Sequence, residues 1–370
     1  MAEEFDLVCL SHLRWDFVFQ RPQQLMSRCV RERRVFFIEE PVFEGNRAEI
    51  KLRLSPQGVQ IAVPFLPAGL TEEEAGAQQK KLLAELFAQQ NIKKFVLWYY
   101  TPMAINWADL PSPLATVYDC MDELSAFQGA SPALLECEQE LFRRADLVFT
   151  GGQSLYEAKQ TRHPHVYAFP SSVDVPHFAQ ARHGLPDPDD QKSIAHPRLG
   201  FFGVIDERLD LELLRDAAAM RPDWQWVIIG PVVKIDQNKL PQSQNIHYLG
   251  GKSYDVLPAY LAHWDAALLL FARTEATRFI SPTKTPEYLA AGKPVVSTSI
   301  RDVVRPYGDQ GCVRIADTPA DFVAACEAAL TEDNTDRRQR ADTFLSQMSW
   351  DKTWRQMADL IEKVVASHHS

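Results

Sequence analysis

The sequence lacks the features that define several classes of protein. Its six cysteines are scattered and form no Cys-x-x-Cys pair, which argues against a disulfide framework and favours free thiols in a reducing compartment. No apolar run approaches the roughly 20 residues that span a bilayer. The acidic start, Met-Ala-Glu-Glu-Phe-Asp, has neither the basic nor the apolar region of a secretory signal. We therefore expect a cytoplasmic protein.

Positive charge is also in deficit. The net charge of −10 over 370 residues argues against nucleic acid as the main partner. Hydrophobic residues at 46% and charged residues at 24% are typical of a globular protein. A chain of this length exceeds one ordinary hydrophobic core, so the sequence predicts two domains.

Strand-like and helix-like segments alternate along both halves of the chain. We predict strands at 6–10, 34–38, 95–100, 115–119, 147–150, 166–169, 199–205, 225–229, 246–249, 266–271, 295–298 and 313–315. We predict helices at 22–32, 71–90, 132–144, 209–220, 254–262 and 319–330. This alternation indicates an α/β fold with parallel, doubly wound sheets.

The alternation stops between the two halves. Residues 183–197 are rich in proline and acidic residues and have no hydrophobic period, which predicts an interdomain linker. We therefore predict two Rossmann-like domains, 1–182 and 198–348, and a C-terminal helical segment at 349–370.

The most informative stretch runs from Phe279 to Thr298. Ser281 suits a helix N-cap, and a β-branched run after Gly-Lys-Pro predicts a buried strand. Lys284 and Glu287 are three residues apart and share one helix face. A lysine at a helix start suits a phosphate, and a glutamate one turn later suits the two hydroxyls of a ribose. A surface helix with an ion pair explains the same residues, so both interpretations stay open at this point.

Ser-Pro-x-Lys-x-x-Glu-Tyr-x-Ala-x-Gly-Lys-Pro-Val-Val resembles the nucleotide-binding segment of GT-B glycosyltransferases, specifically the retaining family called GT4. The wider string from Thr274 to Lys284 resembles a subgroup of cell-surface polysaccharide glycosyltransferases of the teichuronic acid type. The resemblance implies that Glu287 holds the ribose of a sugar nucleotide. It also implies that Ser281 and Lys284 meet the diphosphate.

One feature of that family is missing. The family often has a second glutamate near the donor sugar, eight positions before Glu287, where this chain has Phe279. Glu275 or Arg278 could take the place of that glutamate. The identity of the donor and the handling of its hydroxyls therefore depart from the usual pattern.

Two further candidates belong to the same domain. Gly203 follows a predicted strand, where a doubly wound domain lets its backbone approach a ligand. The resembling family has a basic residue shortly after this glycine that meets the diphosphate. Arg208 is the nearest basic residue here, Lys234 is an alternative, and a solvated helix position is the other interpretation of Arg208.

The first domain offers acidic and aromatic candidates. Asp119 ends an apolar strand and Asp122 follows it, where open α/β sheets place ligand groups, so we predict both as catalytic residues facing the sugar. The alternative for Asp122 is a helix cap. The loop after the first strand lacks the glycines usual in the family. It carries instead four candidates for stacking and hydrogen bonding to an acceptor sugar: His12, Trp15, Gln20 and Arg21.

The resemblance implies a hexosyltransferase that moves a sugar from a nucleoside diphosphate sugar to an acceptor hydroxyl with retention, in surface polysaccharide biosynthesis. It also implies no cofactor beyond the donor, no bound metal, and a last helix that crosses back onto the first domain. The expected acceptor is a saccharide or a lipid-linked sugar. Basic residues at 28–34 suggest peripheral contact with an anionic membrane. A nucleotide-sugar 2-epimerase and a non-catalytic nucleotide-sugar-binding homologue are the alternatives.

Overall fold

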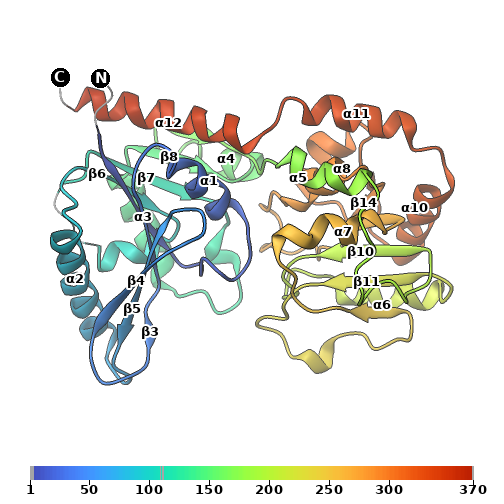
Figure 1. Cartoon of the computed structure of the whole chain (residues 1–370), viewed down its shortest axis with the longest axis horizontal. Helices are drawn as coiled ribbons and strands as arrows, with labels where there is room; N and C mark the ends of the chain where they lie inside the picture. The colour runs from blue at the N-terminus through green and yellow to red at the C-terminus, as the bar shows by residue number, and fades with distance from the viewer. Residues whose placement is uncertain (1–3, 109, 111, 369–370) are drawn as a thin grey trace. The chain divides into compact units, whose positions relative to one another are not determined.

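The computed structural model describes residues 4–108, 110 and 112–368 (Figure 1). The chain divides into two compact units. The first unit combines Met1–Pro170 with Asp351–Ser370, and the second comprises Ser171–Trp350. In the described residues, no helix is both long enough and apolar enough to cross a membrane.

The first unit is built on a largely parallel sheet in the order β3-β5-β2-β1-β6-β7-β8-β9, with β4 antiparallel to β5. Its central strand β1 is buried along its whole length because it lies between β2 and β6 and carries apolar side chains on both faces. The strands are β1 (Asp6–Ser11), β2 (Val35–Glu39), β3 (Val42–Phe43), β4 (Glu49–Leu54), β5 (Gln60–Leu66), β6 (Phe95–Tyr99), β7 (Ala115–Cys120), β8 (Leu147–Thr150) and β9 (Val166–Ala168). The helices are α1 (Arg21–Cys29), α2 (Glu72–Gln89), α3 (Ala133–Arg144), α4 (Gln153–Lys159) and α12 (Trp350–Ser367).

The second unit has a parallel sheet in the order β12-β11-β10-β13-β14-β15. In chain order this is 3-2-1-4-5-6, so the direction of winding reverses between β10 and β13. The strands are β10 (Arg198–Phe202), β11 (Gln225–Ile229), β12 (Ile246–Tyr248), β13 (Ala266–Leu269), β14 (Val295–Ser297) and β15 (Arg314–Ile315). The helices are α5 (Val175–Ala179), α6 (Leu211–Met220), α7 (Leu257–Ala262), α8 (Lys284–Ala290), α9 (Arg301–Val303), α10 (Pro319–Thr331) and α11 (Thr335–Leu345). The predicted α/β fold with doubly wound parallel sheets is therefore confirmed.

Each face of the second sheet has its own hydrophobic core, because successive side chains of a strand point to opposite faces. Phe202 packs with residues of α5, α7, α8 and α11, whereas Phe201 packs with residues of α6 and α10. The residue before Phe201 must be glycine, because a Cβ on Gly200 would lie 2.0 Å from the Trp264 ring. The small residue lets Trp264 lie directly against β10.

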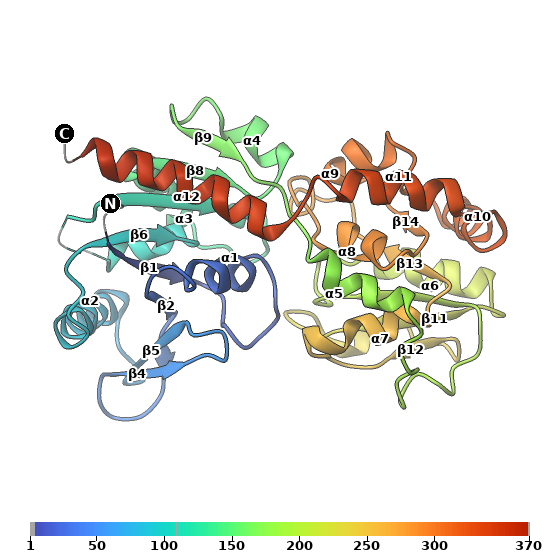
Figure 2. The same cartoon turned by 45° about the horizontal axis from the view of Figure 1, so that its top comes forward.

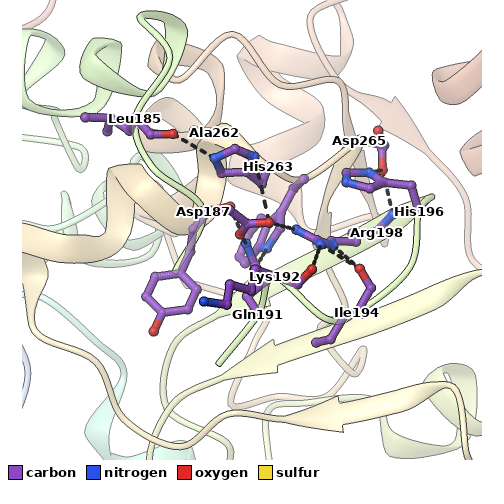
Figure 3. A network of polar contacts seen from close by, with 12 residues as sticks. Leu185, Asp187, Gln191, Lys192, Ile194, His196, Arg198, Ala262, His263 and Asp265 are labelled. Carbon is purple, nitrogen blue, oxygen red and sulfur yellow. Dashed lines mark hydrogen bonds and ion pairs between the residues drawn. The ribbon is translucent and has the colours of Figure 1, made fainter. Parts of the chain in front are cut away.

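The segment predicted as a linker is instead packed against the second unit (Figure 3). Arg198 and Gln191 are 2% and 0% exposed. The Arg198 guanidinium donates to Asp187 at 2.7 Å and to the Ile194 carbonyl at 2.6 and 2.8 Å, while Gln191 accepts from Trp264 Nε1 at 2.8 Å. The proline-rich, acidic composition of residues 183–197 does not predict this packing, because polar rather than apolar side chains make the contacts. The division between the units falls at Pro170 instead.

Helix α12 follows the second unit in sequence but packs on the first unit (Figure 2). Its Asp351 forms ion pairs with Arg28 at 3.1 Å and Arg31 at 2.8 Å. Trp354 lies with its ring centroid 6.4 Å from that of Trp98, next to the sheet of the first unit. The helix is thus held by both charge and aromatic packing.

These contacts also concern the basic residues on which the expected membrane contact depends. Arg28 and Arg31 share Asp351, while Arg33 pairs with Glu362 and Arg34 with Asp6 at 2.6 Å. The four arginines therefore contact these three carboxylates of the first unit, and the side chains of Arg28 and Arg33 are only 8% and 11% exposed. This geometry gives no support to the predicted basic patch.

Candidate functional site

The winding of the second sheet reverses between β10 and β13, and two glycines follow strands at this edge. Gly203 comes after β10 with φ at +148°, and Gly230 comes after β11 with φ at +150°. The Gly203 N–H donates to the Ile229 carbonyl at 2.8 Å, and a Cβ at Gly230 would lie 1.7 Å from the Gly203 oxygen. Both positions therefore require glycine.

Lys284 lies directly over the first of these loops. It is the first residue of α8, and its Cε would be 2.1 Å from a Cβ placed on Gly203, with Nζ at 2.7 Å. Its ammonium also lies 5.9 Å from the centre of the Phe201 ring. Because Gly203 has no side chain, the Lys284 side chain has room at the carboxyl end of β10. Open α/β sheets bind ligands at this edge.

Glu287 lies one helical turn further along α8 and is 6% exposed. Burial raises the pKa of its carboxyl group to about 7, an effect that the nearby Lys284 ammonium partly offsets. A buried carboxyl group with a perturbed pKa, next to a lysine at a switch point, is characteristic of a functional site. The structure therefore brings together Gly203, Lys284 and Glu287, as the sequence predicts.

The start of α8 differs from the prediction. Thr283 is the N-cap and makes no side-chain cap hydrogen bond, so the predicted N-cap role of Ser281 is wrong. Ser281 instead receives the Ser171 N–H on Oγ at 3.4 Å and the Ser171 hydroxyl on its carbonyl at 2.6 Å. The Ser281 hydroxyl thus contacts Ser171, the first residue of the second unit. The two residues are 110 positions apart, so no local sequence pattern predicts this contact. Its contact with a diphosphate stays a prediction.

The two predicted arginines lie in loops beside this edge. Arg208 forms a double hydrogen bond with Asp206, with Nε at 3.0 Å and Nη2 at 2.7 Å, so its charge is compensated within the loop. Arg278 is 59% exposed in its side chain, lies 3.4 Å from Glu275, and covers the Phe279 ring at 5.2 Å. Lys284 is therefore the predicted cation that the structure places against the glycine loop.

Sequence reasoning missed the residue that shapes the loop after β13. Thr277 is fully buried and donates its hydroxyl to the Ala272 carbonyl, while accepting the Thr274 N–H at 2.9 Å. These bonds fix the turn that presents Arg278 and Phe279. The hydroxyl-bearing residues at 274 and 277 are a signal for this arrangement, because threonine commonly bonds to the backbone a few residues away.

Two of the first-unit candidates bind each other. Asp119 and Arg21 are 0% and 2% exposed, and Arg21 donates to the carboxylate through Nε at 3.0 Å and Nη2 at 2.9 Å. Arg21 Nη1 also donates to the Phe169 carbonyl at 2.7 Å. Burial raises the pKa of Asp119, and the arginine opposes this effect. The geometry therefore makes this pair an internal link between α1, β7 and the chain after β9, and does not support a sugar-facing Asp119 or an acceptor-side Arg21.

Trp15 is also buried. Its ring meets the Phe37 ring edge-on at 5.0 Å, and its backbone N–H donates to the Glu39 carboxylate at 2.8 Å. The structure therefore supports a packing role for Trp15 in the first unit rather than stacking on an acceptor sugar. His12, Gln20 and Asp122 are partly exposed, and their acceptor-side and catalytic roles stay predictions.

A buried charge network that the sequence did not indicate lies behind the loop after β7. Lys159 Nζ lies 2.7 Å from Glu123 and 2.8 Å from Glu138, and the Tyr118 hydroxyl donates to Glu138 at 3.0 Å. These contacts fix the loop that carries Asp122. Over the part of the chain that the structure describes, no three histidine, cysteine or acidic side chains are grouped to hold a metal ion.

The whole chain resembles solved structures of glycosyltransferases with the GT-B fold. It matches sucrose-phosphate synthase from Thermosynechococcus elongatus with a TM-score of 0.72 and 14% identity, over 98% of this chain and 100% of that one. It matches Anabaena HepE in complex with UDP-glucose with a TM-score of 0.69 and 14% identity, over 97% and 100% of the two chains. The fold is therefore GT-B.

Sequence similarity points to the same class of protein. Residues 196–332 match the family described as glycosyl transferases group 1, and this segment contains Gly203, Lys284 and Glu287. Over 302 residues the chain is 28% identical to TuaH of Bacillus subtilis (strain 168), a candidate glycosyltransferase of teichuronic acid biosynthesis. The match covers 75% of this chain and 74% of that protein.

Proposed function

We propose that this chain is a glycosyltransferase that moves a sugar from a nucleoside diphosphate sugar to an acceptor hydroxyl. One observation carries the proposal: Lys284 lies over the Gly203 loop at the switch point, with the buried Glu287 one turn away. This group lies inside the segment that matches glycosyl transferases group 1. The similarity to HepE, solved with UDP-glucose, supports a nucleoside diphosphate sugar as the donor.

Each residue of the group has a role that its chemistry allows. The Lys284 ammonium would stabilise the negative charge that develops on the departing diphosphate, which is how fixed charges accelerate such reactions. The lack of a side chain at Gly203 would leave room for the Lys284 side chain to reach the phosphates. The two carboxylate oxygens of Glu287 would accept hydrogen bonds from both ribose hydroxyls.

The finer parts of the proposal concern stereochemistry and pathway. We take the transfer to be a hexosyl transfer that retains the anomeric configuration, with the charge of the leaving group neutralised by side chains rather than by a metal. The similarity to TuaH, which is described as a glycosyltransferase of teichuronic acid biosynthesis, supports a saccharide or lipid-linked acceptor in surface polysaccharide synthesis. His12, Gln20 and Asp122 are the candidates for contact with that acceptor.

A donor screen followed by a turnover assay tests the proposal. Thermal shift with UDP-, GDP- and TDP-sugars should identify a donor that stabilises the protein. Turnover of that donor should then rise when a saccharide acceptor is added. Conversion of the donor sugar to its 2-epimer without acceptor would identify an epimerase, and donor binding without turnover would identify a non-catalytic binding protein.

A further inference from the structure

A pocket of about 770 Å³ opens on the surface of the second unit. It lies between α11 and the loop before β15, and its lining includes none of the residues of the nucleotide site. Pockets that bind small ligands typically measure about 300–1,000 Å³. The pocket is therefore large enough to be a separate binding site.

The pocket is lined along one face of a helix. Gln339, Thr343 and Gln347 are spaced by four residues on α11 and the turn that follows it, so they lie in one row. Gln310 faces this row from the loop before β15. The two walls carry three side-chain amides, which can both donate and accept hydrogen bonds; that of Gln347 also donates to the Ser346 hydroxyl at 3.1 Å. The Thr343 hydroxyl donates to the Gln339 carbonyl at 2.9 Å, so it can face a ligand as an acceptor.

Contacts between the two walls hold the pocket in shape. Arg340 donates from Nη2 to the Gly311 carbonyl at 3.3 Å, and Gly311 has φ at +64°, a conformation that favours glycine. At the base, the half-buried Phe344 ring meets the Tyr307 ring edge-on at 5.1 Å. The lining thus combines a half-buried apolar ring with exposed polar side chains.

The lining indicates the class of ligand. Its charged residues, Asp336 and Arg340, cancel, which disfavours a nucleotide or another anion. A peptide is usually recognised at a sheet edge or in an apolar groove, and this lining contains neither. A neutral saccharide fits, because its hydroxyls need donors and acceptors together and its C–H face needs an apolar ring.

We propose that this pocket is a second saccharide-binding site that holds a neutral stretch of polysaccharide away from the nucleotide site. The choice of a polysaccharide rests partly on the proposed glycosyl transfer. Binding itself requires neither a donor nor turnover. It can therefore be measured separately from the proposed function.

The test uses the full chain carrying Glu287→Ala, which removes the proposed ribose contact. Maltohexaose, cellohexaose and chitohexaose are titrated by calorimetry. At least one should bind with a Kd below about 5 mM. The double variant Gln339→Ala, Gln347→Ala should weaken this binding at least about fivefold, since two hydrogen-bonding groups are lost. Gln356→Ala, an exposed helical glutamine of the first unit, is the matched control and should leave the affinity unchanged.

Absence of binding by all three hexasaccharides up to about 10 mM would overturn the inference. Equal affinity of the double variant and its parent would overturn it as well, because the saccharide would then bind elsewhere. Failure of every nucleotide sugar to bind the unmodified chain, with hexasaccharide binding intact, would refute the proposed function and leave this site standing.

Discussion

The affinity for a donor sugar should fall when the pH is lowered through 7. In the proposed site Glu287 would accept hydrogen bonds from both ribose hydroxyls as a carboxylate and would lose this bidentate contact on protonation, and burial raises its pKa to about 7. The carboxylate fraction is then roughly nine-tenths at pH 8 and one-tenth at pH 6, so affinity should drop about tenfold between these values. A nucleoside diphosphate sugar is the right probe, because its doubly esterified diphosphate does not titrate in this range.

The same residue predicts an effect on stability with the opposite sign. Because the folded-state pKa of Glu287 lies above its ordinary value of 4.5, the folded protein binds the proton more tightly than the unfolded chain. The carboxylate therefore costs folding free energy that grows as the pH rises from 4.5 through 7, by up to about 3 kcal/mol. Glu287→Gln should raise the unfolding free energy at pH 8, although it weakens the donor.

Calorimetry with the donor at pH 6, 7 and 8, and denaturant unfolding at pH 8, measure both effects. Glu287→Gln should bind at least about tenfold more weakly at pH 8, since charge-assisted hydrogen bonds are lost. Its affinity should then vary little with pH. A pH dependence that persists in the variant, or a variant less stable than its parent at pH 8, would refute the reasoning.

Three further predictions concern the glycine loop, the buried pair and metal. Gly203→Ala places a Cβ on the Lys284 side chain and should weaken donor binding about tenfold, whereas Gly251→Ala, whose Cβ would meet only Pro231 at 3.8 Å, should leave calorimetric affinity unchanged. Asp119→Ala leaves Arg21 buried without its partner, so denaturant unfolding should show a loss of about 3–5 kcal/mol; a loss below 1 kcal/mol would contradict the buried pair. Turnover should persist in EDTA, because Lys284 supplies the charge, and activity restored only by Mg²⁺ or Mn²⁺ would contradict this.

Much of the fold could be predicted because its signals are local. The alternation of apolar strands and amphipathic helices fixes two parallel sheets, and the spacing of Lys284 and Glu287 places both on one face of α8. The glycine at 203 follows its strand directly. Each of these features depends on residues within one turn or one strand.

The remaining features depend on contacts between distant parts of the chain. Arg21 and Asp119 are 98 positions apart, and neither shows from its neighbours that it is buried and paired. The composition of the acidic segment at 183–197 predicts a solvated linker. Arg198, the partner of Asp187, lies just beyond this segment at the start of β10, so the segment alone does not show the ion pair. Ser281 looks like an N-cap until Ser171 is brought against it. The role of a polar side chain depends on its tertiary partners, and the hydrophobic periodicity of the sequence does not predict those partners.

In the proposed site, Lys284 and Glu287 hold a nucleoside diphosphate sugar at the Gly203 loop. Calorimetry of the unmodified chain, Lys284→Met and Glu287→Ala with the donor that emerges from the UDP-, GDP- and TDP-sugar screen tests it most directly. We expect a single site whose affinity falls at least about tenfold in each variant, since each removes a charge-assisted contact. Equal affinity in all three proteins, or no binding of any nucleotide sugar by the unmodified chain, would contradict it.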